Sequence, residues 1–413
     1  MTKPDLAAFC AALVLMLGGV AQAQPAVSWT GSWASAQQVP EPNNALPPTD
    51  LQDATLRQIV HLSLGGSAVR IRLANDFGTQ PLTFTSVHVA LARAPGTAAI
   101  VAGSDRTVTF SGQGAVTVPA GAAYWSDPVQ LSAIDGADLA VSFHFGRAPQ
   151  GETSHPGSRA TSFLVHGDHT ADPDLPGAER FEHWFELSGV DVRRVGAAVV
   201  AFGDSITDGH GSTTDRNDRW PDDLARRLHA AGRAIGVLNA GIGGNHILTD
   251  GLGPNAIARF ERDLLDQTGV RAVILLEGIN DLGGFSRDHA DAPPEGHAAL
   301  LARLFQADEQ FIARAREHGL KVFGATLTPY VGSDYYHPGP ANEADRQKLN
   351  AWIRTPGRFD AVIDFDKAAR EPAHPDRLLP AYDSGDHLHP SPAGYRAMAQ
   401  AIPLAILPSG RGR

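Results

Sequence analysis

The sequence predicts an α/β fold of the doubly wound class, a five-stranded parallel sheet flanked by helices, preceded by an antiparallel β-sandwich. Its 413 residues exceed what one hydrophobic core usually organises, so two domains are expected. The first part has a period of two, as in half-buried strands, and the second part alternates strands with helices. We therefore place a sandwich domain at residues 24–192 and an α/β domain at residues 193–413.

The first residues, Met1–Ala23, have the form of a cleaved export signal. Lys3 supplies a positive start, Leu6–Val20 is apolar, and the small residues around Ala23 suit a signal peptidase that cleaves after this residue. The apolar stretch is shorter than the about 20 residues of a membrane-spanning helix. We therefore expect a secreted or periplasmic protein without a stable membrane anchor. The only cysteine, Cys10, lies in this segment, so the mature chain forms no disulfide and has no thiol nucleophile.

The charge of the chain excludes some partners. It has 34 basic and 45 acidic residues and a formal net charge of -11. Such a field repels polyanions, so neither nucleic acid nor an anionic membrane surface is an expected partner. An acidic surface also keeps an exported protein soluble.

The sandwich is predicted from strict alternation between turns. In Val69–Leu73 three apolar residues face one way and two arginines the other, and Leu139–Phe145 alternates in the same manner. Turn-forming pairs such as Asp135-Gly136 separate these runs. The pattern favours a jelly-roll-like sandwich. Carbohydrate binding and a purely structural role both remain open for it.

The α/β part is predicted from continuous apolar runs, typical of strands buried on both faces. These runs lie at residues 197–202, 235–239, 272–276, 322–327 and 361–365. One helix is expected from Trp220 to about Gly232 and another over Ala298–His318. In such sheets the active site lies at the carboxyl ends of the strands, so chemically active residues should directly follow them.

Ser205 follows the first of these strands, in the turn Gly203-Asp204-Ser205-Ile206. A serine at a strand-to-helix turn can expose its hydroxyl, and Asp204 is expected to fix the turn. Near the end of the chain, Ser391 reads as a helix N-cap and places His389 on the preceding loop. Asp386, three residues earlier, can bond one imidazole nitrogen while the other faces Ser205. These residues form a nucleophile, base and orienting acid.

Two further turns can supply hydrogen-bond donors. The glycine-rich segment Asn239–Asn245 follows the second strand and leaves backbone N–H groups open to a ligand. A phosphate cradle is the alternative, but the segment lacks the Lys-Ser/Thr ending of a P-loop. After the third strand, the side-chain amide of Asn280 can donate to a developing oxyanion, and Asp281 is expected to bond loop N–H groups.

A metal site is the competing interpretation of the C-terminal segment, because Asp383, Asp386, His387 and His389 are all possible ligands. A metal site needs further ligands at fixed spacing, and no HExxH-like pair is present. We therefore predict no metal and no cofactor, and expect His387 to be a surface or packing residue.

The serine, glycine, asparagine and terminal DxxH blocks occur in the order that defines the SGNH/GDSL hydrolase family, and the chain resembles that family. The resemblance implies a flavodoxin-like three-layer domain in which Ser205 is the nucleophile, His389 the base and Asp386 its partner. It also implies an oxyanion hole formed by the N–H of Ser205, Gly244 and Asn280. Ile206 replaces the family's usual leucine. The layout of a sandwich upstream of such a domain is similar to that of bacterial esterases in this family that act on acetylated polysaccharides.

The expected activity is hydrolysis of short acyl esters, above all acetyl esters, of carbohydrates or other small molecules through an acyl-enzyme on Ser205. An acyltransferase with the same residues and a carbohydrate-binding protein with an inactive hydrolase-like domain are the alternatives. Trp220 is expected either to line the acyl pocket or to lie in the core. The tract Pro329–Pro340, with its three tyrosines, is expected to be a loop that can contact sugar.

Overall fold

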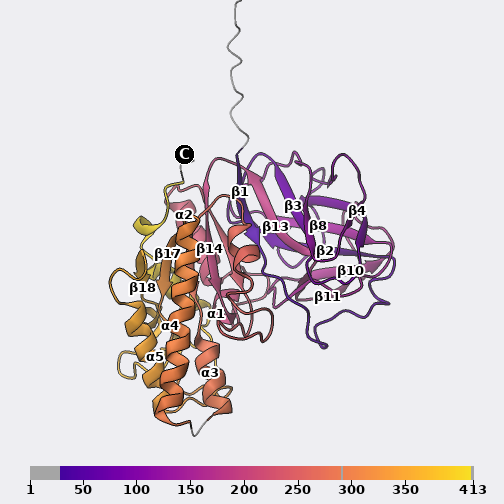
Figure 1. Cartoon of the computed structure of the whole chain (residues 1–413). Helices are drawn as coiled ribbons and strands as arrows, with labels where there is room; N and C mark the ends of the chain where they lie inside the picture. Colours follow the sequence, from indigo (N-terminus) through magenta and orange to yellow (C-terminus); the bar gives the residue numbers. More distant parts are fainter. Residues whose placement is uncertain (1–27, 290–291, 411–413) are drawn as a thin grey trace, which may run out of the picture.

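The computed structural model describes residues 28–289 and 292–410, so the predicted signal Met1–Ala23 lies outside the described residues. Among the described helices, none combines the length and apolar character needed to cross a bilayer. The chain forms two parts side by side, which we call the N-terminal half (residues 28–193) and the C-terminal half (residues 194–410) (Figure 1).

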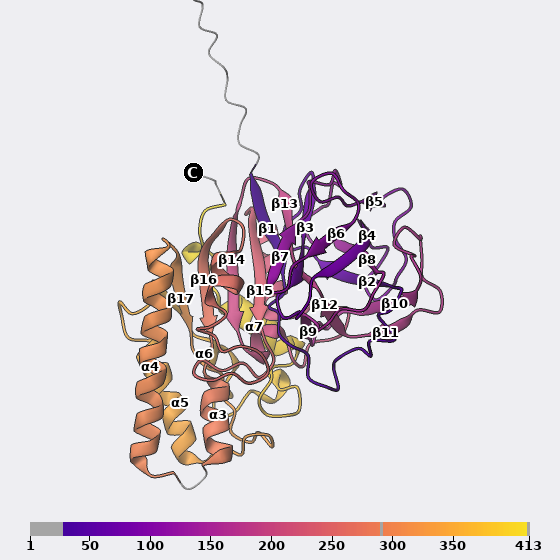
Figure 2. The ribbon, with the colours of Figure 1, turned by 45° about the vertical axis from the view of Figure 1, so that its right-hand side comes forward.

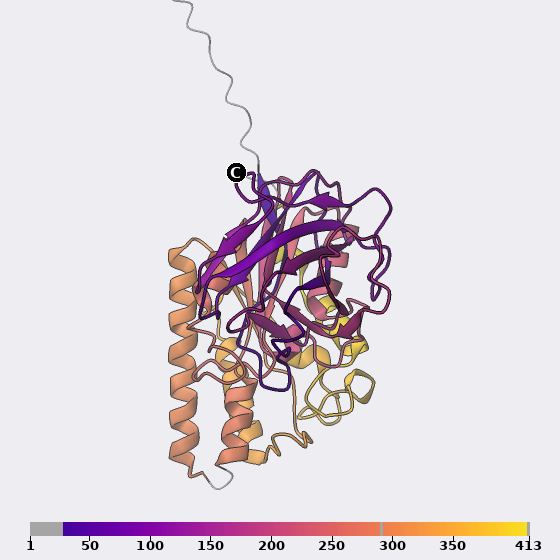
Figure 3. The same cartoon turned by 90° about the vertical axis from the view of Figure 1, so that its right-hand side faces the viewer.

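The described N-terminal half consists of antiparallel strands joined by turns. Figure 3 shows this half from the side, with its purple strands toward the viewer. One sheet has the order β1-β13-β3-β7, a second runs β11-β10-β2-β8-β4-β5 with β6 paired to β4, and β12 pairs with β9. The strands are β1 (Trp29–Ala34), β2 (Ala54–His61), β3 (Val69–Asn75), β4 (Leu82–Leu91), β5 (Arg106–Thr107), β6 (Val116–Val118), β7 (Ala122–Trp125), β8 (Asp138–Phe145), β9 (Ser154–Pro156), β10 (Ser162–His166), β11 (Glu179–Phe181), β12 (His183–Phe185) and β13 (Leu187–Arg193).

A shared apolar core joins the two larger sheets. Ile71 of β3 and Val190 of β13 belong to the same buried cluster as Leu56 of β2 and Phe143 of β8. Because alternate residues of each strand point into this cluster, period-two patterning specifies which face is buried. The predicted antiparallel sandwich is therefore present.

The face of β3 that carries the arginines would be expected to point into water, as in a half-buried strand, but it does not. Arg70 donates to Asp191 at 2.7 Å and to Thr268 at 3.3 Å, while Arg72 is almost completely buried and donates to Ser188 at 2.9 Å. Thr268 belongs to the C-terminal half. The outer face of this sheet therefore packs against the other half of the molecule.

The C-terminal half contains a five-stranded parallel sheet with the order β15-β14-β16-β17-β18 (Figure 2). This is the doubly wound fold that the sequence predicts, and its carboxyl edge is the expected place for chemistry. The strands are β14 (Ala197–Gly203), β15 (Ile235–Gly241), β16 (Val270–Leu276), β17 (Lys321–Ala325) and β18 (Ala361–Ile363).

The helices around this sheet form two packed groups. Helix α2 packs on α7, which also contacts α6, whereas α5 packs on α3 and α4. The helices are α1 (Ser205–Asp208), α2 (Trp220–Ala230), α3 (Ile279–Asp288), α4 (Pro294–Glu317), α5 (Pro340–Ile353), α6 (Phe365–Ala369) and α7 (Pro392–Ala401), with short turns η1 (Glu261–Leu265), η2 (Pro380–Tyr382) and η3 (Leu404–Ile406).

Two predicted strands end earlier than expected. The run 322–327 leaves the sheet after Ala325, because the N–H of Leu327 donates to the side chain of Asn350 at 2.8 Å. The run 361–365 ends at Ile363, and Phe365 begins α6 with Asp364 as its N-cap. A side chain of α5 therefore takes the place of a ladder bond at the first of these strand ends, and the N-cap of α6 ends the second strand.

The two halves meet where β1 contacts β15, the edge strand of the parallel sheet. A Cβ atom on Gly236 would lie 1.9 Å from the carbonyl oxygen of Gly31, so only glycine permits this approach. Ser63 accepts a hydrogen bond at 2.8 Å from the N–H of Val237. The N-terminal half therefore covers an edge that would otherwise be open to pairing with another chain.

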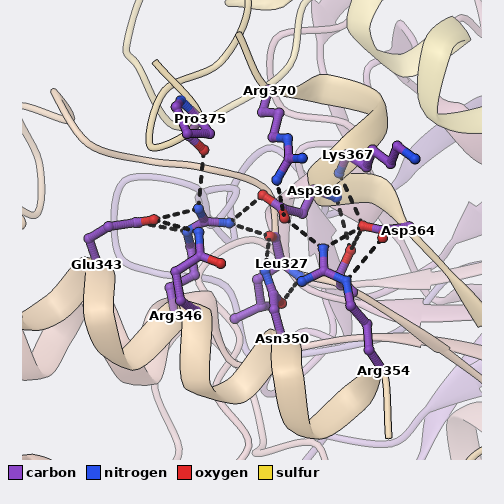
Figure 4. Close-up of polar contacts among 12 residues, drawn as sticks. Leu327, Glu343, Arg346, Asn350, Arg354, Asp364, Asp366, Lys367, Arg370 and Pro375 are labelled. Atoms are coloured by element: carbon purple, nitrogen blue, oxygen red, sulfur yellow. Dashed lines mark hydrogen bonds and ion pairs between the residues drawn. The ribbon is translucent and has the colours of Figure 1, made fainter. Parts of the chain in front are cut away.

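A buried ionic network supports the segment that leads toward the C-terminal motif. Arg346 of α5 is fully buried and bonds Glu343 at 2.7 Å and Asp366 at 2.8 Å, and Arg354 bonds Asp364 and Asp366, each at 2.6 Å (Figure 4). Removal of one partner from such a network leaves a buried charge uncompensated. The network ties α5 to α6, from which the chain continues to the DxxH segment.

Candidate active site

Ser205 is the first residue of α1, directly after β14 at the carboxyl edge of the sheet. Asp204 is the N-cap of this short helix, because its side chain accepts from the N–H of Ile206 at 2.9 Å. Burial raises the pKa of Asp204 to about 7. The turn is thus fixed by a completely buried carboxyl, in the role expected for Asp204.

The structure brings Ser205, His389 and Asp386 into one hydrogen-bonded row. The Ser205 hydroxyl oxygen lies 2.8 Å from Nε2 of His389, and Nδ1 of the same imidazole lies 2.5 Å from Asp386. Ser205 and His389 are both buried, with exposed fractions of 7% and 9%. This arrangement allows the imidazole to take the hydroxyl proton while the carboxylate stabilises the charge that results.

Asp386 is fixed as an anion by its own loop. It accepts from the backbone N–H of His389 at 2.8 Å and of Leu388 at 3.0 Å. Burial opposes ionisation, but the hydrogen bond and charge of His389 and these N–H groups together keep the pKa of Asp386 well below its ordinary value. The imidazole is therefore oriented by a carboxylate at neutral pH.

The glycine segment and Asn280 are tied to each other and to the serine turn. The N–H of Ile242 donates to the carbonyl of Gly203 at 3.0 Å, and the Asn280 amide donates to the carbonyl of Asn245 at 2.7 Å. Gly244 lies in the left-handed region with a φ of 66°. The Asn280 amide group has two N–H donors, so one remains for a ligand. Asn280 occupies the first turn of α3 rather than a loop.

Tyr336 is a site residue that the sequence motifs did not reveal. Its hydroxyl donates to the side-chain oxygen of Asn280 at 2.5 Å, which fixes the orientation of the amide. Tyr330 and Tyr336 are buried and Tyr335 is exposed. The expected sugar contact through this tyrosine tract is therefore wrong for two of its three rings, because they pack inside the C-terminal half.

Trp220 is a core residue, so the alternative that it lines the acyl pocket is wrong. Its side chain is fully buried and packs against Phe365 with ring centroids 5.5 Å apart. It is the first residue of α2, directly before Pro221. It is not among the residues that line the hollow at Ser205.

Arg259 is a second residue that the sequence did not reveal. Its guanidinium is fully buried and donates to the carbonyls of Gly203 at 2.9 Å and Ala240 at 2.7 Å. It also bonds Asn245 at 2.9 Å and Glu277 at 3.1 Å. One side chain therefore holds the ends of β14 and β15, the glycine segment and the residue after β16 together. No motif marks it, because these partners meet only in the folded chain.

Asp281 has the structural role expected of it. Its carboxylate accepts from the N–H groups of Ile247 at 2.9 Å and Leu248 at 3.0 Å. His387 is half exposed and bonds Asp383 at 2.5 Å, away from Ser205. It is thus a surface residue with a carboxylate partner of its own.

His210, also unmarked by any motif, packs on the base. Its ring centroid lies 4.1 Å from that of His389, and its Nε2 lies 3.8 Å from Asp386. Its Nδ1 accepts from Arg159 of the N-terminal half at 3.0 Å, so the ring proton belongs on Nε2. Burial, together with the charges of His389 and Arg159, lowers the pKa of His210 to about 4, and it is neutral at pH 7.

Within the described residues, one group of side chains has the spacing of metal ligands, formed by His210, Asp386 and His389. It differs from the set considered from sequence. Both nitrogens of His389 are engaged in hydrogen bonds, and the cationic Arg159 lies against His210. A second cation here would be repelled by that guanidinium, so the donor set suits proton transfer better than metal binding.

The hollow at Ser205 is lined by both halves of the molecule. The C-terminal half contributes Ser205, His210, Gly243 and Leu252. The N-terminal half contributes a polar wall, which consists of Gln38, Glu41, Asn43, Asn44, Glu182 and His183. Arg159 stands between the two sides, beside His210.

A serine and a histidine at the carboxyl edge of a doubly wound sheet define a class of hydrolytic enzymes. Residues 201–397, just under half of the chain, match the model of the GDSL-like Lipase/Acylhydrolase family, and this part of the chain belongs to that family. The C-terminal half accordingly contains a GDSL-like acylhydrolase domain. Among curated proteins, no sequence matches the chain.

Solved structures similar to the C-terminal half have low sequence identity. The acetyl xylan esterase AlAXEase is 23% identical over 49% of this chain and 96% of its own, with a TM-score of 0.37. A GDSL-like lipase from Bacteroides thetaiotaomicron VPI-5482 is 19% identical over 51% and 87%, with a TM-score of 0.36. A carbohydrate acetylesterase from Sinorhizobium meliloti is 16% identical over 50% and 95%, with a TM-score of 0.37.

Proposed function

We propose that this protein hydrolyses esters of short acyl groups, above all acetyl esters, through an acyl-enzyme on Ser205. The observation that carries the proposal is the row of Ser205, His389 and Asp386, with separations of 2.8 Å and 2.5 Å. His389 takes the hydroxyl proton as Ser205 attacks the carbonyl carbon, and then gives it to the leaving alcohol. Water, activated by the same imidazole, releases the acid.

The oxyanion of each tetrahedral intermediate is proposed to bind three donors. These are the backbone N–H groups of Ser205 and Gly244 and the free N–H of the Asn280 amide. The N–H of Ser205 lies in the first turn of α1, where no intrahelical acceptor exists. Arg259 and Tyr336 support these donors as positioning residues, because they bond the segments that carry them.

The nucleophile is tested by Ser205→Ala with p-nitrophenyl acetate. Loss of the attacking hydroxyl should lower kcat by about 10⁶-fold, while the melting temperature stays within about 2 °C, because one buried hydroxyl is replaced by a methyl group. A serine-directed fluorophosphonate should add its phosphonyl mass to Ser205 in the wild type alone. Retained turnover, or labelling at another serine, would contradict the proposal.

Acyl transfer to an alcohol other than water is the second candidate, since the same acyl-enzyme can react with either. Product analysis with and without added glycerol separates them. We also propose export of the protein, supported by the pattern of Met1–Ala23. The N-terminal residue of protein purified from the periplasm or medium tests this proposal, and Gln24 is the expected result.

A further inference from the structure

The wall opposite Ser205 comes from loops of the N-terminal half that no catalytic motif includes. Gln38, Glu41 and Asn44 form a preorganised group, because Glu41 accepts from Gln38 and from Asn44, both at 2.7 Å. Glu182 accepts from Thr214 of the C-terminal half at 2.9 Å. These contacts hold the wall against the half that carries the nucleophile.

The loop behind this wall is fixed in a strained conformation. Arg159 has a φ of 52°, in the left-handed region, and faces Asp215, which has a φ of 61°. The N–H of Asp215 donates to the carbonyl of Arg159 at 2.9 Å, and the Asp215 carboxylate accepts from the N–H and hydroxyl of Thr161, each at 2.7 Å. Non-glycine residues persist in this region when surrounding contacts over-determine them, which occurs most often at functional sites.

The wall reaches the catalytic base, and its polar character indicates which part of the ester it meets. Arg159 bonds His210, and His210 packs on His389. The N-terminal half therefore reaches the catalytic imidazole through His210. Gly243 and Leu252, on the glycine segment and the loop after it, also line the hollow. A polar wall suits the alcohol portion of the ester better than its short apolar acyl group, because apolar atoms cannot replace the hydrogen bonds of buried polar groups.

The chemistry of the wall indicates which alcohol it takes. Amide side chains offer both donors and acceptors, and carboxylates offer acceptors, as neighbouring hydroxyl groups of a polyol require. An aliphatic alcohol would desolvate these groups without replacing their hydrogen bonds, which disfavours its binding. Glu41, Glu182 and Asp208 outnumber the one arginine around the hollow, so an anionic alcohol is disfavoured.

We propose that the N-terminal half is part of the substrate site, and that its polar wall binds the leaving alcohol of the ester, a neutral polyhydroxylated group such as a sugar. This proposal rests on the proposed hydrolase function. It gives the sandwich a third role, beside the independent carbohydrate binding and the structural cover that its sequence left open.

The test compares alcohols at a constant acyl group. With wild-type protein, kcat/KM for an acetylated xylo-oligosaccharide should exceed that for hexyl acetate by at least about tenfold, the size of one lost hydrogen bond. The double variant Asn43→Ala/Glu182→Gln should lower this ratio at least fivefold, chiefly through KM. The matched control Gln113→Ala/Glu179→Gln likewise changes one side-chain amide and one glutamate, at exposed positions outside the hollow, and should leave the ratio unchanged.

An unchanged ratio in a folded double variant would overturn the proposal, and so would a wild-type preference for hexyl acetate or an acetylated uronate. If the double variant unfolds, the same ratio measured with Asn43→Ala alone decides. Failure of the hydrolase function gives a different result: Ser205→Ala would then hydrolyse every ester as well as the wild type. Saturation-transfer NMR of Ser205→Ala with the oligosaccharide, with and without the wall substitutions, reports binding independently of catalysis.

Discussion

The two sides of the hollow at Ser205 are built in different ways. On the C-terminal side, the chemical residues lie where a strand ends or shortly before a helix begins, and the parallel sheet brings Ser205 to His389 although 184 residues separate them. On the N-terminal side, Arg159 and Glu182 lie on loops, and their partners His210 and Thr214 are 51 and 32 residues away. The carboxyl edge of one sheet organises the C-terminal side, and docking of the two halves forms the N-terminal side.

This difference separates chemistry from recognition. The C-terminal side carries the proton transfers, which tolerate displacements of only a fraction of an ångström. The residues on the N-terminal side can change with the loops of the sandwich without disturbing His389. His210 is the exception, because it touches both Arg159 and His389. Five substitutions test how independent the two sides are, from the largest expected effect to the smallest.

Asp386→Asn should disrupt the proton transfer on the C-terminal side. An amide in place of the carboxylate cannot hold the same imidazole tautomer, so kcat for p-nitrophenyl acetate should fall by about 10⁴-fold. Asp383→Asn is the matched control, since Asp383 bonds His387 at the same 2.5 Å in the same loop but not His389. If both variants lose activity equally, the loop as a whole is required and Asp386 has no special role.

Asn280→Ala should have the next largest effect. Removal of one oxyanion donor should lower kcat by about 10²–10³-fold with little change in KM. Asn350→Ala, which removes another buried asparagine bonded to the backbone of Leu327, should lower stability but leave kcat nearly unchanged. A change confined to KM for Asn280→Ala would assign this residue to substrate binding.

His155→Phe should weaken the contact between the N-terminal and C-terminal halves. His155 bonds Asp208 of α1 at 2.9 Å and the carbonyl of Ala36 at 2.7 Å, and both side chains of the His–Asp pair are buried. Loss of these bonds leaves Asp208 without this partner and should destabilise the protein by about 1–3 kcal/mol in urea unfolding. His88→Phe, at a more exposed pair with Asp105, should cost less. An equal loss of unfolding free energy in both variants would mean that the contact between the halves contributes no more than an ordinary His–Asp pair.

Asp308→Asn should change how the stability of the C-terminal half depends on pH. Burial in α4 raises the pKa of Asp308 to about 8, so between about pH 4 and pH 8 the folded state holds a proton that the unfolded chain has released. Stability is therefore lost as pH rises through this range. The variant should match the wild type near pH 4 and melt higher at pH 8, by about 2–4 °C for each 1 kcal/mol.

Glu186→Gln makes the corresponding change in the N-terminal half, where complete burial also raises the pKa of the glutamate well above its ordinary value. Comparison of the two melting curves against pH shows which half sets the pH dependence of unfolding. A melting temperature at pH 8 that is lower for Asp308→Asn than for the wild type would contradict the expected loss of stability with rising pH.

Much of the C-terminal half could be predicted because its information is local. Apolar runs mark the strands from β14 to β18, and the Ser391 N-cap fixes where α7 begins, with His389 on the loop before it. Trp220 and the tyrosine tract could not be predicted in the same manner. Their positions near motifs in sequence say nothing about which way a ring turns, and packing against Phe365 and Asn280 decides this.

The sequence alone determined the order of strands and helices, the alternation of the sandwich and the identity of Ser205, Asp386 and His389, because periodicity and short motifs are properties of neighbouring residues. Only the tertiary structure decided that Arg259 joins three strand ends, that Arg70 and Arg72 face the other half, and that the sandwich lines the hollow at Ser205. These depend on contacts between residues far apart in the chain, and such contacts exist only when the complete fold brings the segments together.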